Sequence, residues 1–527
     1  MPSGSKNVNS SGYARIRTGR RLALPLLVLL FATWSHTQEP ANPPSVTFRT
    51  AANLVVLDAV VKDRDGKPVT NLTKDDFTVL EDGVVQTIAS FESASSQGKP
   101  APAAATGKNN SEAKPSTPVS PQALTILVLD ELNSEVFDQA YGRNAIEKFL
   151  AKHGPRLEQP ASLMLLGQKR IELLRDYTQD AGALADALHS RHAELPFGLL
   201  AAEFSGTAER FSKTLWALQQ IAAANSHFAG RKNVIWVGPG FPAINGRSLD
   251  LADQPRFRTA ISESATLLLR ARVSVYTINP RGLEVSPTMY SAFAGGNFLT
   301  GTQDQMTGDL LFESIAPETG GGIFRLRNDV DVAISESVDD GSAYYSFAYY
   351  PTNREWNGKY RRIEIAVRDQ GLQARTRKGY FALAENPLDD HQVDTVLSRA
   401  VMNPLPYRAL EVEARAKSAG AAKGRFVIKV DRHGLYWETL PDGKRRCEVT
   451  VVIASVGAGD QIYSHKVTEL ESVVDSKRFE QQWNRPAVFD LVSDLPSKTR
   501  HVRIVVRDAH SDRIGSADLS REALPVR

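Results

Sequence analysis

The chain has 527 residues, which is too long for one hydrophobic core and is typical of three or four domains. Hydrophobic residues make up 42% of the chain and charged residues 23%, so most of it should fold as ordinary globular protein. The formal net charge of +3 is small for this length and gives no reason to expect a nucleic-acid partner or an anionic membrane surface. The single cysteine, Cys447, excludes an intrachain disulfide, and we expect it to be a small core residue of a strand.

The N-terminus has the pattern of a secretory signal peptide. Arginines at positions 15, 17, 20 and 21 precede a short apolar run over residues 22–34. That run is shorter than the roughly 20 residues that a transmembrane helix needs. We therefore assign residues 1–37 as a signal peptide and expect an exported protein, periplasmic or extracellular, with no membrane span in the mature chain. An uncleaved N-terminal anchor is the alternative.

Short strand patterns follow in residues 46–92. Asp65-Gly66 and Asp82-Gly83 mark turns between them, because glycine supplies the positive φ that such turns require. This pattern predicts a small β-sandwich-like module. Residues 93–122 are rich in Ser, Ala, Lys, Pro and Asn without periodicity, which predicts a flexible linker.

Residues 123–383 alternate strand-like and helix-like patterns, the signature of an α/β domain. The run over residues 124–130 is almost continuously apolar, as in a strand buried on both faces of a parallel sheet. The prediction is a doubly wound, mostly parallel sheet. Residues 344–350 and 362–367 are interpreted as its edge strands.

The last third of the chain begins with a Pro-containing connector over residues 384–408, for which a short helix at 394–402 is expected. Residues 409–527 contain further strand patterns separated by turn clusters at 441–443 and 457–460. This spacing predicts a C-terminal β-sandwich-like domain.

Polar residues come directly after the apolar run at 124–130. Asp130 and Ser134 would lie at the carboxyl end of a buried strand, where α/β sheets bind ligands. One hypothesis is that they belong to a metal site on the rim of the sheet. The alternative is that Asp130 only caps the turn that follows the strand.

Several motifs resemble the von Willebrand factor type A domain, and more closely the secreted VWFA-related proteins of the acidobacterial type. The motifs are Leu127-Val-Leu-Asp-Glu-Leu-Asn-Ser134, Lys232-Asn-Val-Ile-Trp-Val-Gly-Pro-Gly240, Gly358-Lys-Tyr-Arg-Arg-Ile-Glu-Ile365 and Arg377-Lys-Gly-Tyr380. Segments 61–69 and 72–83 are similar to the N-terminal β module of that family. The resemblance covers about residues 46–383 and implies a von Willebrand A-like fold.

Domains of this type often bind a divalent cation at a metal-ion-dependent adhesion site. The resemblance implies that Asp130, Ser134 and Thr207 would supply oxygen ligands, which suit Mg²⁺. The pattern is incomplete, because Leu132 stands at the position of the middle serine and Gly238 where a later aspartate is expected. We therefore expect a degenerate adhesion site, with Mg²⁺ as its candidate ion.

The sequence contains no nucleophile-elbow, P-loop or dinucleotide-binding motif. Together with the export signal, this favours a non-enzymatic protein-binding or adhesion protein whose ligand is an unidentified protein. A secreted hydrolase with a dispersed site is the alternative, and a purely structural role in the cell envelope is not separated from the binding role.

Overall fold

The computed structural model describes residues 15–16, 54–94, 123–191, 203–226, 228, 230–241, 244–245, 264, 266–281, 309–310, 312–384, 388–419 and 422–524. The predicted linker 93–122 and nearly all of the predicted signal peptide 1–37 lie outside these ranges. None of the helices within them is long and apolar enough to cross a membrane.

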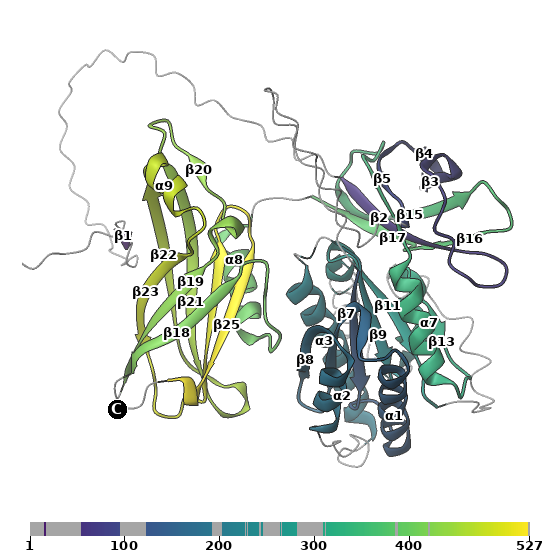
Figure 1. Ribbon diagram of the computed structural model, residues 1–527, viewed down its shortest axis with the longest axis horizontal. Helices are drawn as coiled ribbons and strands as arrows, with labels where there is room; N and C mark the ends of the chain where they lie inside the picture. Colours follow the sequence, from purple (N-terminus) through teal and green to yellow (C-terminus); the bar gives the residue numbers. More distant parts are fainter. Residues whose placement is uncertain are drawn as a thin grey trace, which may run out of the picture.

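The central domain is a doubly wound α/β sheet (Figure 1). Its strand order is β13-β11-β9-β6-β7-β8, in which only the pairing of β8 with β7 is antiparallel. The order reverses at β6, so the two halves of the sheet wind outward from the first strand, as in other open doubly wound sheets. The strands are β6 (Leu124–Asp130), β7 (Arg156–Leu166), β8 (Ile171–Asp180), β9 (Lys232–Val237), β11 (Val273–Ile278) and β13 (Ile323–Phe324).

Helices cover both faces of this sheet. They are α1 (Val136–Lys152), α2 (Ala181–His189), α3 (Glu203–Asn225), α6 (Ile315–Thr319) and α7 (Val330–Ser342). Strand β6 shows how the two faces are filled: Leu127 and Leu129 enter the core under α1, α2 and α7, while Ile126 and Val128 enter the core under α3 and α6. This confirms that the apolar run is a strand buried on both faces, because successive side chains point to opposite sides. Three short elements flank the sheet: β10 (Ile244–Asn245), β12 (Asp309–Leu310), which pairs with β10, and η5 (Phe312–Ser314).

Two four-stranded antiparallel sheets form a sandwich whose strands come from both sides of the α/β domain in sequence. Their strand orders are β16-β2-β14-β5 and β17-β15-β3-β4. Thus β2, which precedes the α/β domain in the sequence, lies between β16 and β14, which both follow α7. The elements are β2 (Val55–Lys62), η1 (Lys74–Asp76), β3 (Phe77–Glu81), β4 (Val84–Gln86), β5 (Ile88–Glu92), β14 (Tyr345–Tyr349), β15 (Asn357–Val367), β16 (Gln373–Thr376) and β17 (Gly379–Leu383).

This arrangement corrects two of the predicted boundaries. The predicted module 46–92 does not form a sheet of its own, and the α/β domain ends near Ser342 instead of at residue 383. The predicted edge strands at 344–350 and 362–367 are central strands of the sandwich. The physical reason is aromatic packing between distant segments: the ring of Phe77 lies 4.9 Å from the rings of both Tyr345 and Phe347.

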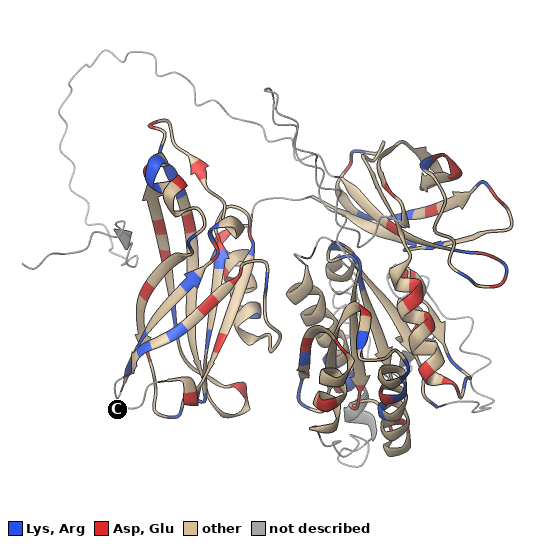
Figure 2. Cartoon of the chain, viewed as in Figure 1, with Lys and Arg blue, Asp and Glu red and all other residues tan. Residues whose placement is uncertain are grey.

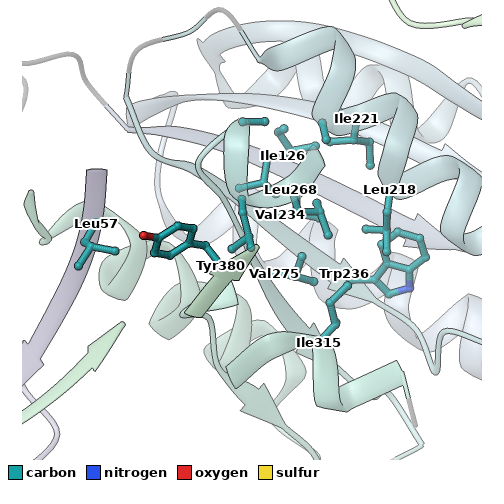
Figure 3. Close-up of a cluster of buried hydrophobic side chains, with 14 of the residues drawn as sticks. Leu57, Ile126, Leu218, Ile221, Val234, Trp236, Leu268, Val275, Ile315 and Tyr380 are labelled. Atoms are coloured by element: carbon teal, nitrogen blue, oxygen red, sulfur yellow. The ribbon is translucent and has the colours of Figure 1, made fainter. Parts of the chain in front are cut away.

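The sandwich and the sheet share one continuous core (Figure 3). Leu57 and Tyr380 of the sandwich belong to the same buried cluster as Val275 and Trp236 of the sheet. The sandwich contacts the amino ends of the parallel strands, where Tyr344 accepts a hydrogen bond from the backbone N–H of Arg231 at 3.4 Å. The carboxyl ends of these strands therefore lie away from the sandwich.

The C-terminal region consists of two further antiparallel sheets that enclose a shared core. Their orders are β1-β22-β21-β24-β25, with β20 on β21, and β18-β19-β23. Cys447 of β21 is buried in this core, as expected, and burial raises the pKa of its thiol to about 12. The strands are β1 (Arg15–Ile16), β18 (Val412–Ala419), β19 (Lys423–Val430), β20 (Glu438–Thr439), β21 (Arg445–Val456), β22 (Ile462–Val474), β23 (Ala487–Asp494), β24 (His501–Asp508) and β25 (Ile514–Ser520).

The predicted connector packs against this region. Its helix, α8 (Asp390–Met402), starts earlier than expected, because Asp389 and Gln392 form a capping box. Leu397 and Val401 of α8 pack with buried residues of β21 and β24. The Asn403 amide donates to the Gln220 carbonyl of α3 at 3.2 Å, which joins the connector to the α/β domain. The remaining short elements are α9 (Ser476–Gln482), η6 (Arg432–Gly434), η7 (Ala458–Asp460) and η8 (Arg521–Ala523).

A buried ion pair joins strands of the sandwich that are far apart in sequence. Glu81 of β3 pairs with Arg361 of β15 at 3.0 Å, and the hydroxyls of Tyr349 and Tyr380 donate to the same carboxylate at 2.7 and 2.9 Å. Both charged side chains are nearly inaccessible to water. Removal of the carboxylate leaves a buried guanidinium without its counter-charge.

We predict that Glu81→Ala lowers the free energy of unfolding by about 3–5 kcal/mol, the cost of breaking a buried pair from one side. Urea denaturation of the protein measures this change. Glu364→Ala removes an exposed carboxylate from β15 and should change stability by less than about 0.5 kcal/mol. Equal effects of the two substitutions would contradict a stabilising role for the buried pair.

Candidate functional site: the closed rim at the end of β6

The chain turns away from the sheet directly after Asp130, and the first residues of the loop remain inside the protein. Residues 130–134 are all buried, with exposed fractions between 0% and 6%. The backbone N–H groups of Glu131 and Leu132 both donate to the carbonyl of Leu166 at the end of β7, at 3.0 and 2.9 Å. Leu132 then enters the core beneath α3 and α6. The loop therefore closes this edge of the sheet.

The Asp130 carboxylate is the centre of the loop. Its Oδ1 accepts from the backbone N–H of Asn133 at 3.0 Å and from the Asn133 side-chain amide at 3.1 Å. Its Oδ2 accepts from the same amide at 3.0 Å, from Trp236 Nε1 at 3.0 Å and from the Gly240 backbone N–H at 3.1 Å. Both oxygens are thus occupied by neutral N–H donors.

The alternation of side chains along the strands explains the contact with Trp236. In the parallel pairing of β6 with β9, Val128 stands opposite Trp236. Asp130 lies two residues further along β6, so it points to the same face as Val128 and Trp236. The indole N–H thereby reaches the carboxylate.

Two glycines allow the turn after β9 to approach this carboxylate. A Cβ atom on Gly238 would lie 2.5 Å from Cβ of Asp130, which no side chain can tolerate. A Cβ atom on Gly240, whose φ is +68°, would lie 2.1 Å from Cγ of Phe312. Phe312 packs on Trp236 with 4.9 Å between ring centroids, so aromatic rings cover the site from this side.

Further polar contacts hold the rest of the loop. Glu131 pairs with Arg143 of α1 at 2.6 Å, and its carboxylate is fully buried. The side-chain amide of Gln139 donates to the carbonyls of Glu131 and Ser134 at 3.0 and 3.3 Å. Because these contacts bind the loop to the first turns of α1, strand, loop and helix form one rigid unit.

The predicted metal ligands are not arranged for a divalent cation. Asp130 already accepts N–H donors on both oxygens, and Gly238 has no room for the missing carboxylate. Ser134 is buried beside Asp130 in the loop. Thr207 lies in the first part of α3, but its side chain is outside the described residues. Mg²⁺ requires several oxygen ligands, including waters, so the residues described at this position do not fit it.

Helix α3 contributes Thr214, which is fully buried, to the site. Its Oγ1 accepts a hydrogen bond from the Asn133 amide at 3.1 Å. Thr214, Asn133 and Trp236 were not predicted as site residues. An asparagine three residues after an aspartate is a local turn signal, whereas the contacts of Thr214 and Trp236 are tertiary and leave no signal in the sequence.

The electrostatics of Asp130 reflect two opposing effects. Burial raises the pKa of this carboxyl group, and the donors from Asn133, Trp236 and Gly240 oppose the rise. All of these contacts come from N–H groups, which only an acceptor can satisfy. The geometry therefore supports the ionised carboxylate, which these N–H groups hold and which also interacts with the charge of Arg210 on α3.

The accessible part of this edge lies one turn further on, at the start of α1. Val136, Phe137 and Tyr141, which we call the rim patch, are 52%, 87% and 40% exposed. Residues of the patch line a surface hollow of about 710 Å³ together with Pro280 and Arg281. Large apolar side chains grouped on a surface often mark an interaction site.

Charged groups border the rim patch. Arg281, which follows β11, pairs with Glu135 and Asp138 of the α1 start at 2.9 Å each. The Tyr141 hydroxyl donates to the Asn328 carbonyl. The patch is thus an apolar centre with a polar border, the composition of many protein-binding surfaces.

Fold and site together define a doubly wound α/β domain in which a buried carboxylate closes the carboxyl edge of the sheet and an exposed apolar patch lies beside it. The sequence matches no protein-family model and no curated protein. Among solved structures, the chain is similar to the crystal structure of the SpRpn10 VWA domain, with 13% identity over 41% of this chain and 96% of that domain and a TM-score of 0.23. A TM-score this low does not establish a shared fold, so the class of the domain rests on its own sheet topology.

We predict that Asp130→Asn lowers the free energy of unfolding by at least about 2 kcal/mol, because one amide cannot accept from all the N–H groups that now share a carboxylate. Urea denaturation checks this value. Asp186→Asn, an exposed substitution on α2, is the matched control and should be neutral. A neutral Asp130→Asn would mean that the carboxylate does not organise the loop.

A second prediction concerns the metal. Titration of the protein with Mg²⁺ or Mn²⁺ should produce no binding heat at millimolar metal, because both Asp130 oxygens already accept N–H donors. Gly238→Asp restores a carboxylate of the adhesion pattern, yet we expect it to lower the unfolding midpoint and still bind no metal, since its Cβ would collide with Asp130. Saturable binding heat with either metal that is lost in the Asp130→Ala variant would contradict this prediction.

Proposed function

We propose that this chain is an exported, non-enzymatic protein-binding protein that contacts its partner through the rim patch of the α/β domain. The observation that carries the proposal is Phe137, a large apolar side chain that is 87% exposed at the start of a helix. Exposing an aromatic ring to water is unfavourable, and covering it with a partner removes that cost. The export signal over residues 1–37 supports a periplasmic or extracellular location.

The position of the rim patch supports the same proposal. The sandwich contacts the amino ends of the strands, and the patch lies near their carboxyl ends. A partner can therefore approach the patch without displacing the sandwich. The buried Asp130 loop fixes the start of α1, so the patch is presented on a rigid support, which lowers the entropy cost of binding.

We propose that adhesion by this protein does not depend on a metal ion. In the arrangement around Asp130, a cation has no free carboxylate oxygen to use. We therefore propose that the degenerate site acts as an internal brace and that apolar contact supplies the affinity. The alternative predicted from the sequence was a secreted hydrolase. Within the described residues, no particular arrangement of side chains supports it.

A pull-down from envelope and secreted fractions with the mature chain tests the proposal. We expect Phe137→Ser to reduce capture of the bound protein at least about tenfold, which corresponds to about 1.4 kcal/mol of binding free energy. Circular dichroism should show an unchanged fold, because the side chain is mostly in water.

Val467→Ser is the matched control, since Val467 is an apolar residue of β22 that is 50% exposed in the C-terminal region. It should leave capture unchanged. Capture that persists with Phe137→Ser, or that Val467→Ser reduces equally, excludes the rim patch as the binding site.

A further inference from the structure

A second cavity lies at the opposite end of the α/β domain, where the sandwich meets the start of β11. Its volume is about 300 Å³, and it opens to solvent. Leu54 and Val56 at the start of β2, Leu269 and Arg270 before β11, and residues of β17 form its walls. This volume is within the range of pockets that hold small organic ligands, and the rim patch has no part in it.

The described charged residues that line the cavity are all basic. Arg270, Arg272 and Arg377 line the cavity, and among the described residues no carboxylate does so. Figure 2 likewise shows basic positions at the boundary between the α/β domain and the sandwich. Arg270 is an exposed residue at the end of the helical turn 266–270, and no hydrogen bond or ion pair of its side chain occurs within the described residues.

The carboxylate of Asp58 lies behind the cavity among several cations, and the charge of Glu92 also acts on Arg272. Asp58 of β2 pairs with Arg272. Burial would raise the pKa of Asp58, but Arg272, Arg231 and Arg377 together hold it below its usual value. Burial and the charge of Arg272 lower the pKa of the nearby Lys232 to about 7. These groups leave an excess of positive charge beside the cavity.

Arg377 contributes most clearly to this excess of positive charge. Its Nη1 and Nη2 donate to the carbonyls of Leu269, at 3.2 Å, and Val56. Its buried Nε has no partner among the described residues, and its side chain forms no ion pair there. A guanidinium that is held by neutral carbonyls in a partly enclosed place is stabilised when an anion binds.

The other wall of the cavity is aromatic. Trp356, Tyr380 and Phe381 line it. The Tyr380 hydroxyl is committed to Glu81, and the guanidinium of Arg361 lies 5.3 Å from the centre of the Trp356 ring, so these rings are fixed by contacts of their own. They offer a rigid apolar surface next to the arginines.

We propose that this cavity binds a small organic carboxylate with an apolar body about the size of one aromatic ring. The anionic group is recognised by Arg377 and Arg270, and the apolar body packs against Trp356 and Phe381. An arginine fork suits a carboxylate because its N–H donors match the two oxygens. The ligand site is independent of the protein-binding rim patch.

Calorimetric titration of the mature chain with benzoate tests the proposal, with benzyl alcohol as the neutral analogue and acetate as the anion without an apolar body. We expect benzoate to bind at least about tenfold more tightly than either analogue. Arg270→Glu, at the exposed edge, should weaken benzoate binding about tenfold or more, because it reverses one of the charges that face the ligand.

Three variants complete the test. Arg415→Glu makes the same charge reversal on β18, outside the cavity, and should leave benzoate binding within twofold. Phe137→Ser should also leave it unchanged, which separates this site from the proposed protein-binding function. Arg377→Gln should abolish binding if the variant folds, and Arg270→Glu decides the matter if it does not.

Two results would overturn the proposal. The first is equal affinity for benzoate and benzyl alcohol, or no benzoate heat at millimolar concentration. The second is an equal loss with Arg270→Glu and Arg415→Glu, which would assign the effect to the overall charge of the protein.

Discussion

One buried carboxylate organises the end of the α/β sheet on which the proposed function depends. Asp130 receives hydrogen bonds from its own loop, from the neighbouring strand β9 and from the turn after that strand. Burying an ion is costly, and here several N–H dipoles offset the cost within a few ångströms. Gly238 and Gly240 are required for this arrangement, because any side chain at either position would collide with Asp130 or Phe312. These contacts make the loop a closed brace at this edge of the sheet.

This brace acts together with the way the chain is laid out. The sandwich is assembled from strands on both sides of the α/β domain, so the domain is inserted between two halves of one β-structure. The domain follows β5 and precedes β14, which pair with each other in one sheet of the sandwich, and the two units share a continuous core. The two candidate surfaces lie at opposite ends of the sheet: an apolar patch at the start of α1 and a basic, aromatic cavity beside β11. Each is supported by buried polar contacts, the Asp130 loop in one case and the Asp58–Arg272 pair in the other.

The sequence predicted the parts of the fold that have local signals. The apolar run ending at Asp130 predicted a doubly buried strand, and the alternation of elements predicted a doubly wound sheet. The incomplete pattern at Leu132 and Gly238 led us to expect a degenerate metal site, and that expectation stays a prediction. The sandwich was divided wrongly, because the pairing of β2 with β14 joins segments almost 300 residues apart, and strand periodicity does not reveal a partner. For the same reason, only the tertiary structure shows that Trp236 and Thr214 contact the loop. It also shows that Arg270 and Arg377 line the same cavity.

The central claim is that Asp130 holds the rim by hydrogen bonds without a metal ion. A crystal structure of the protein grown with excess Mn²⁺, with anomalous data collected, tests it most directly. We expect no anomalous peak beside Asp130, and we expect its oxygens to retain the contacts with Asn133, Trp236 and Gly240. A peak at Asp130 accompanied by loss of the Trp236 or Gly240 contact would contradict the account and return the site to metal-dependent adhesion.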